Sequence, residues 1–276
     1  MTTLTGIHLP YFFGAYGHDL APNLRLGTGP EEVDPRLIHR SLLTAHEAGF
    51  QAVHLWLCEA GEGVVMEADS ILGVHPVLVE SVAIIQECAS LCGLLLYWTL
   101  LDGHSRQRSA DTLCSEILSM SDRTAQFAER VAGPLARRFD PQLTVAVEVA
   151  NEPAALVAEP QEGREGARVE WQSLGRAIET IAEAIRAELA ATLVTAGSQL
   201  AVLPLLWRAA RGLTAIDVHI EPDSKLPSRA EVAAALLSPL ADSIPLIAGC
   251  VGETAATTEV AREDYCAVFV EGVTGW

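Results

Sequence analysis

Basic residues are scarce in this chain of 276 residues, and lysine is nearly absent. The 36 acidic residues outnumber the 18 basic ones, and Lys225 is the single lysine, so the formal net charge is −18. A surface with this charge repels the phosphate backbone of nucleic acids and the anionic lipids of membranes. The composition therefore excludes a general nucleic-acid-binding protein and disfavours a protein that binds membrane surfaces.

Long apolar runs and targeting signals are missing as well. The longest apolar run, residues 94–101, has eight residues, whereas a membrane-spanning helix needs about 20. The start, Met-Thr-Thr-Leu-Thr, has neither the basic segment nor the apolar stretch of a secretory signal. The six cysteines follow no disulfide framework of a small secreted domain, and the spacing of Cys88 and Cys92 suits one face of a helix. We therefore expect a cytoplasmic protein with reduced thiols.

What the chain has in abundance is apolar residues, at 50% of the total. This excludes a disordered protein and supplies a large core. Short apolar runs alternate with amphipathic stretches that have helical spacing. The predicted strands are residues 5–11, 51–58, 94–101, 143–150, 192–196, 214–220 and 245–251, with an eighth beginning at 273. The predicted helices are residues 35–48, 76–92, 110–138 with a break at Gly133-Pro134, 168–190, a segment ending at 211, 229–240 and 259–270.

Seven βα units and the start of an eighth predict a (β/α)8 TIM barrel that forms one domain over residues 1–276. The barrel is minimal and lacks its last helix, which leaves a seam that a second subunit of a homo-oligomer could cover. The alternative is an open doubly wound sheet. That fold normally carries a G-x-G-x-x-G sequence after its first strand, and the segment Gly14-Ala-Tyr-Gly17 does not match it.

The end of the fourth predicted strand carries the main candidate site residues. Active sites of parallel barrels lie at the carboxyl ends of the strands. Side chains alternate along a strand, so Glu148, Ala150 and Glu152 share the inward face. At the rim, partial burial is expected to raise the pKa of Glu152, as a general acid requires.

Four segments carry a resemblance to a known family: 52–57 (AVHLWL), 147–153 (VEVANEP), 216–219 (IDVH) and 245–249 (PLIAG). In order and spacing the chain resembles the clan A glycoside hydrolases, in particular the family 5 barrels, over nearly its whole length. The resemblance implies that Glu152 is the acid/base and that Asn151 contacts the sugar 2-hydroxyl. It also implies a nucleophilic glutamate at the end of strand seven and a retaining reaction.

The sequence departs from the family pattern around that nucleophile. Cys250 stands at the position of the nucleophilic glutamate, Glu221 follows strand six where the family has tyrosine, and His54 replaces an arginine of strand two. Two designs follow. Cys250 is a thiolate nucleophile activated by a nearby histidine, or Glu221 is the partner carboxylate of Glu152 and Cys250 lines the pocket.

Further substrate-binding candidates lie at other strand ends. They are His54, His219, Trp98, Asp102, His104 and Trp276, where the tryptophans would stack on a sugar ring. His8, His54, His219, Glu221 and Cys250 could also face one barrel mouth and bind a metal. Strand one, however, offers His8 alone and no His-x-His pair, so we expect no metal and no cofactor.

The sequence thus predicts a glycosidase-like enzyme that acts on a small glycoside or sugar-like molecule. Two alternatives remain open on the same fold. One is an enzyme repurposed for a non-hydrolytic reaction of specialised metabolism. The other is a catalytically silent barrel that binds a sugar or a protein partner.

Overall fold

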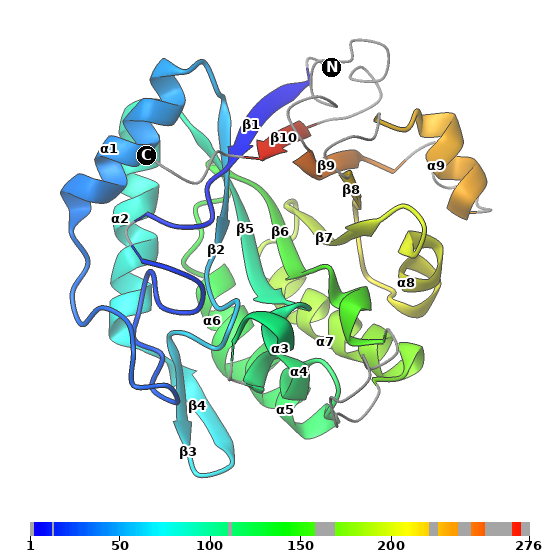
Figure 1. The fold of residues 1–276 in the computed structure, drawn as a ribbon, viewed down its shortest axis with the longest axis horizontal. Helices are drawn as coiled ribbons and strands as arrows, with labels where there is room; N and C mark the ends of the chain where they lie inside the picture. Colours follow the sequence, from blue (N-terminus) through cyan, green and yellow to red (C-terminus); the bar gives the residue numbers. More distant parts are fainter. Residues whose placement is uncertain are drawn as a thin grey trace.

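A computed structural model describes residues 3–12, 14–109, 112–157, 169–220, 226–236, 244–251 and 267–271, with only the backbone at positions 106, 250, 251, 270 and 271. Eight parallel strands form a closed barrel in the order β1-β10-β9-β8-β7-β6-β5-β2 (Figure 1). The predicted (β/α)8 barrel is confirmed. The barrel strands are Leu4–His8 (β1), Ala52–Trp56 (β2), Leu95–Asp102 (β5), Thr144–Asn151 (β6), Leu193–Gln199 (β7), Ile216–Ile220 (β8), Leu246–Val251 (β9) and Ala267–Glu271 (β10).

Helices surround the strands. A capping residue precedes the first helix, and another follows the second. Asp34 accepts a hydrogen bond from the backbone N–H of Arg36 before α1, and Gly93 ends α2 with φ 67°. α1 and α2 pack side by side next to β2 (Figure 1). The helices are Pro35–Glu47 (α1), Pro76–Cys92 (α2), Ser105–Arg108 (α3), Leu113–Ile117 (α4), Ser121–Phe127 (α5), Gly133–Ala136 (α6), Trp171–Glu188 (α7), Leu203–Ala209 (α8) and Arg229–Leu236 (α9).

The predicted helix over residues 110–138 is divided differently. α4 and α5 are separate, and a π-helical turn, Ala128–Ala132, joins α5 to α6. Gly133-Pro134 does not interrupt the helical path here: Pro134 is the second residue of α6, directly after the π-helical turn.

The last barrel strand lies earlier than predicted. Residues 267–271, expected to end a helix, form β10, which pairs with β1 from Leu4↔Ala267 to His8↔Glu271 and also with β9. Its Val and Phe residues favour a strand, and pairing on both sides overrides the helical spacing. Hydrogen bonds therefore close the seam between the first and last strands. An antiparallel hairpin of Val64–Glu67 (β3) and Ser70–Val74 (β4) was not predicted.

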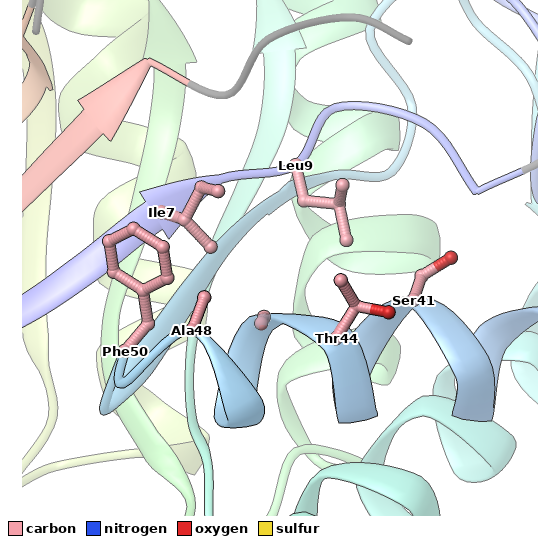
Figure 2. A pocket seen from close by; sticks show the side chains of 7 residues that line it. Ile7, Leu9, Ser41, Thr44, Ala48 and Phe50 are labelled. Atoms are coloured by element: carbon pink, nitrogen blue, oxygen red, sulfur yellow. The ribbon is translucent and has the colours of Figure 1, made fainter. Parts of the chain in front are cut away.

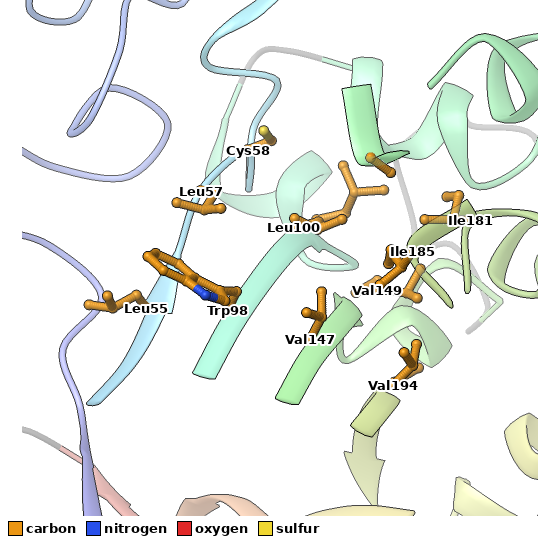
Figure 3. Close-up of a cluster of buried hydrophobic side chains, with 14 of the residues drawn as sticks. Leu55, Leu57, Cys58, Trp98, Leu100, Val147, Val149, Ile181, Ile185 and Val194 are labelled. Atoms are coloured by element: carbon orange, nitrogen blue, oxygen red, sulfur yellow. The ribbon is translucent and has the colours of Figure 1, made fainter. Parts of the chain in front are cut away.

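Side chains of the barrel strands separate into an outer and an inner set. Outward residues of β2, β5, β6 and β7 form one apolar layer, and α7 packs against this layer at β6 and β7. Figure 3 shows Leu55, Trp98, Val147 and Val194 of this layer with Ile181 and Ile185 of α7. Inside the barrel, a small apolar cluster contains Ala52, Tyr97, Ala146, Ile247 and Phe269. Toward the carboxyl ends of the strands the buried inner residues become polar, and this is where a site can form.

The apolar pocket in Figure 2 is not that site. It lies between β1 and α1, has a volume of about 20 Å³, and is lined by Ile7, Leu9, Ser41, Thr44, Ala45, Ala48 and Phe50. This space holds little more than one water molecule and lacks convergent polar groups. No helix in the described part of the chain is both long and apolar enough to cross a membrane.

Candidate active site

Glu152 stands just past the end of β6 in a rare backbone conformation. Its φ and ψ are 43° and 46°, in the left-handed region that non-glycine residues seldom adopt. Its N–H donates to the carbonyl of Gly197 on β7 (3.0 Å), and Pro153 begins a 3-10 turn directly after it. Such strain costs of order 1–3 kcal/mol and tends to persist at functional sites. The turn holds the Glu152 side chain at the mouth, where it is 15% exposed.

Two side chains from neighbouring strands hold the Glu152 carboxylate. His219 on β8 places Nδ1 2.8 Å from Oε1, and Ser198 on β7 donates its hydroxyl to Oε2 over 3.1 Å. The predicted site residues Glu152 and His219 therefore come together as a hydrogen-bonded pair.

A buried polar layer lies directly beneath this pair. Nε2 of His219 is 3.7 Å from Oε1 of Glu148 and 3.9 Å from Oδ1 of Asp217. Backbone N–H groups of Gly197 and Gly249 donate to the same two oxygen atoms, each over 2.8 Å. Both carboxylates are fully buried, so His219 faces three acidic groups at once.

His54 belongs to the same layer and is 1% exposed. Its Nδ1 lies 3.0 Å from the Gly249 carbonyl, and its Nε2 lies 2.6 Å from the hydroxyl of Thr99, which donates to Glu148 over 2.5 Å. Its ring stacks on Tyr97 at 4.1 Å. Both ring nitrogens of His54 are therefore engaged with other groups of the barrel. His54 does not reach the surface of the mouth.

The charges of this network fix where the proton lies. Burial raises the pKa of Glu152, but the hydrogen bond and the charge of His219 outweigh burial, so its pKa lies below the ordinary value. Burial lowers the pKa of His219, but the hydrogen bond to Glu152 and the charges of Asp217 and Glu148 raise it to about 9. The expectation of a raised pKa at Glu152 is therefore wrong, and the free pair is a carboxylate and an imidazolium at neutral pH.

Asn151 and Asp102 form a second cluster beside Glu152. The amide of Asn151 donates to Oδ1 of Asp102 over 2.8 Å, and the hydroxyl of Tyr16 donates to Oδ2 over 2.6 Å. The backbone N–H of His104 also donates to Asp102, over 3.1 Å, and the His104 side chain lies partly exposed. Arg108 covers Tyr16 with its guanidinium carbon 5.6 Å from the ring centre. The structure thus brings Asn151, Asp102 and His104 together at the mouth.

The predicted role of Trp98 in sugar stacking is wrong. Trp98 is fully buried on the outer face of β5, stacks on Phe139 at 4.8 Å and donates from Nε1 to Thr144 (Figure 3). Its neighbour in register, Leu55, is also in the outer layer, whereas Trp56 pairs with the inward Thr99. The side chain of Trp98 therefore points away from the barrel interior.

Three of the predicted site residues lie wholly or partly outside the part of the chain that the structure describes. Glu221 and Trp276 lie outside the described residues. The backbone of Cys250 lies in β9 and pairs in register with His219 on β8. The side chain of Cys250 lies outside the described part of the structure.

Sequence reasoning assigned no role to several residues of this network. Glu148 shares its face with Glu152, and Asp217 lies two positions before His219, so strand alternation was the available signal for both. Thr99, Tyr97 and Ser198 offered no comparable signal. Among the described residues, the side chains whose ligand atoms lie close enough to hold a metal ion are Glu148, Asp217 and His219, of which His219 was in the predicted set.

Comparisons with known proteins add evidence on the fold. No protein-family model matches the sequence, and no curated protein matches it. Among solved structures, a beta-1,4-mannanase from the sea hare Aplysia kurodai has a TM-score of 0.74 at 13% identity, over 98% of this chain and 87% of that one. A beta-1,4-D-mannanase from Cryptopygus antarcticus has a TM-score of 0.74 at 12% identity, over 99% and 85%.

A further similar structure was determined with a bound sugar. This is GH5_18 from Streptomyces cattleya in complex with GlcNAc, with a TM-score of 0.65 at 15% identity, over 98% of this chain and 71% of that one. At these identities the likeness establishes the barrel fold. The chain has the fold of these glycoside hydrolases.

Proposed function

We propose that this protein is a glycoside-hydrolase-like enzyme in which Glu152 is the general acid/base. The observation that carries the proposal is the position of Glu152 at the carboxyl end of the fourth barrel strand, partly exposed and 2.8 Å from His219. Catalytic groups of TIM barrels stand at such strand ends. The solved structures with the same fold include enzymes named mannanases, which supports a carbohydrate substrate.

The pair of Glu152 and His219 holds the proton that an acid needs. Transfer of one proton from Nδ1 of His219 to Oε1 of Glu152 turns the ion pair into a neutral carboxylic acid and a neutral imidazole. A bound substrate displaces water, and loss of water favours the neutral pair. Glu152 then protonates the glycosidic oxygen as the C–O bond breaks, and its carboxylate later takes a proton from the attacking water.

The second catalytic group is Cys250 or Glu221. In the first case a thiolate of Cys250 attacks the anomeric carbon, the aglycone leaves, and water displaces the sulfur from the glycosyl-enzyme. In the second case Glu221 acts as nucleophile, or as the base for water in an inverting reaction. With both nitrogens of His54 engaged, ionisation of the Cys250 thiol depends on a different base.

Asn151, Asp102 and His104 are proposed to bind the hydroxyl groups of the substrate. The amide of Asn151 donates one hydrogen bond to Asp102, which leaves its carbonyl oxygen and a second N–H for a sugar. Tyr16 orients Asp102 from the other side. We propose a small glycoside or sugar-like substrate for this cluster.

The test compares wild type with Glu152→Gln on aryl β-mannosides, aryl β-glucosides and mannooligosaccharides. We expect Glu152→Gln to lower kcat by about 10²–10⁴ for poor leaving groups, and less for nitrophenyl glycosides, which need little protonation. Glu188→Gln, which changes an exposed carboxylate on α7, is the control. No turnover of any glycoside by wild type would contradict hydrolysis and favour a repurposed or silent barrel.

A second set of variants identifies the other catalytic group. Cys250→Ala and Glu221→Gln are compared, and an intact-mass measurement searches for a thioglycosyl adduct during turnover. An adduct that forms on wild type and is absent from Cys250→Ala identifies the Cys250 thiolate as the nucleophile. The anomeric configuration of the first product, read by proton NMR, separates retention from inversion.

A further inference from the structure

Three buried side chains with metal-ligand atoms converge one layer below Glu152. Nε2 of His219 lies 3.7 Å from Oε1 of Glu148 and 3.9 Å from Oδ1 of Asp217, and each of the three residues offers one ligand atom that lies within 4.8 Å of those of the other two. A point equidistant from atoms with these spacings lies roughly 2.1–2.5 Å from each of them, which is the range of bonds from nitrogen and oxygen ligands to divalent cations.

Nε2 of His219 is an unused ligand atom. It has no hydrogen-bond partner among the described residues, although solvent does not reach it. The two carboxylate oxygens that it faces are too distant for hydrogen bonds. A buried polar atom without a hydrogen-bond partner lowers the stability of the fold by about 1–3 kcal/mol. An ion at the centre of the three atoms would satisfy it.

The remaining contacts orient the three groups as ligands. Nδ1 of His219 is hydrogen-bonded to Glu152, and a carboxylate in this position typically orients a metal-binding imidazole. Gly197 and Gly249 each donate a backbone N–H to one of the carboxylate oxygens and leave its second lone pair for another partner. These contacts hold the oxygen atoms in place before any ion binds.

The negative charge of the buried polar layer also favours a bound cation. Glu148, Asp217 and Glu152 surround one imidazole ring, and among the described residues their partners are imidazoles, hydroxyls and backbone N–H groups. No arginine or lysine side chain contacts these three carboxylates in the described part of the barrel. Buried carboxylates without matching positive charge are costly, and a bound divalent ion would supply that charge.

We propose that Glu148, Asp217 and His219 bind a first-row divalent cation, Zn²⁺ or Mn²⁺. One imidazole and two carboxylates suit these ions. The cation takes the place of a proton on Nε2 of His219 and keeps Nδ1–H directed at Glu152. This site differs from the possible metal ligands named in the sequence analysis. Two of its three ligands, Glu148 and Asp217, lie below the rim of the barrel rather than on it.

The test titrates chelator-stripped protein with Zn²⁺ and Mn²⁺ by calorimetry, without substrate. We expect one bound equivalent in wild type and in the control Glu188→Gln, and at least about tenfold weaker binding in Glu148→Gln and Asp217→Asn. Gly197→Ala removes no ligand but places a methyl carbon 2.1 Å from Nε2 of His219 and 2.6 Å from Oε1 of Glu148. It should weaken binding to a similar degree.

No stoichiometric binding to wild type would overturn the proposal, and so would equal affinity in Glu148→Gln, Asp217→Asn and Glu188→Gln. Where a variant fails to fold by circular dichroism, Co²⁺ bound to wild type tests the ligand directly. Paramagnetic shifts of the His219 ring protons are expected, and unshifted protons would contradict the site. Because no activity is measured, failure of the metal site and failure of the proposed hydrolase are distinguishable.

Discussion

Gly197 and His219 meet so closely across β7 and β8 that a methyl group on Gly197 would lie 2.1 Å from Nε2 of His219. The same methyl group would lie 2.6 Å from Oε1 of Glu148. Glycine at this position allows the imidazole to reach the buried carboxylate while its other nitrogen holds Glu152. The hydrogen-bonded pair of Glu152 and His219 therefore depends on a backbone position that carries no functional group.

Gly197→Ala should therefore lower the free energy of unfolding by about 1–3 kcal/mol, the usual cost of overpacking a core. The measurement is chemical denaturation followed by circular dichroism. Gly73→Ala is the matched control, because the nearest atom to its added carbon is 3.8 Å away. Equal stability of the two variants would show that His219 moves aside at no cost.

The pair of Glu152 and His219 predicts a specific dependence of stability on pH. The pKa of His219 is about 9 in the folded protein against 6.5 for an unperturbed histidine. The stabilisation that protonated His219 gives the folded protein is complete below pH 6.5 and is lost as the pH rises through 9. In chelator-stripped protein, the difference in unfolding free energy between wild type and His219→Gln should therefore shrink by about 3 kcal/mol over that window. Parallel curves for the two proteins from pH 6 to pH 9 would contradict the pairing.

Glu59 should show that a buried carboxylate destabilises the fold at high pH. Burial raises its pKa from 4.5 to about 8, although the N–H of Gly17 donates to its Oε1 over 2.8 Å. Ionisation therefore costs stability as the pH rises from 4.5 through 8. Glu59→Gln should match wild type at pH 4.5 and exceed its stability by about 2–4 kcal/mol at pH 9, measured by denaturation at both pH values.

The control for Glu59 is Glu188→Gln on the surface. Arg137 lowers the pKa of Glu188, so neutralising that carboxyl should give no gain at pH 9. A gain in both variants would point to a general effect of the net charge of −18 rather than to the burial of Glu59.

Trp98 should matter for stability and not for substrate binding. Its ring is fully buried in the outer layer and stacks on Phe139 with an interplanar angle of 8°. Trp98→Ala should lower the free energy of unfolding by about 3–5 kcal/mol. In assays at a temperature where the variant stays folded, KM should equal that of wild type. A raised KM with unchanged stability would return Trp98 to the substrate site.

Much of the barrel was predictable because local patterns carry it. Apolar runs and amphipathic stretches placed seven of the barrel strands and the first two helices, α1 and α2. Residues 267–271 were misassigned because a short apolar segment fits a strand or a helix equally well, and only pairing with β1 and β9 decides between them. The side of the strand occupied by Trp98 was equally beyond reach, since a shift of one residue exchanges the two faces.

The sequence by itself determined the alternating architecture and the position of Glu152 at the end of a barrel strand, since both follow from patterns within a few residues. Only the tertiary structure decided the partners of Glu152. His219 is 67 positions away along the chain, and Thr99 and Glu148 are 49 positions apart. Closure of the barrel brings their strands together at a particular register, and that register turns isolated polar residues into a buried network whose charges set the pKa values of Glu152 and His219.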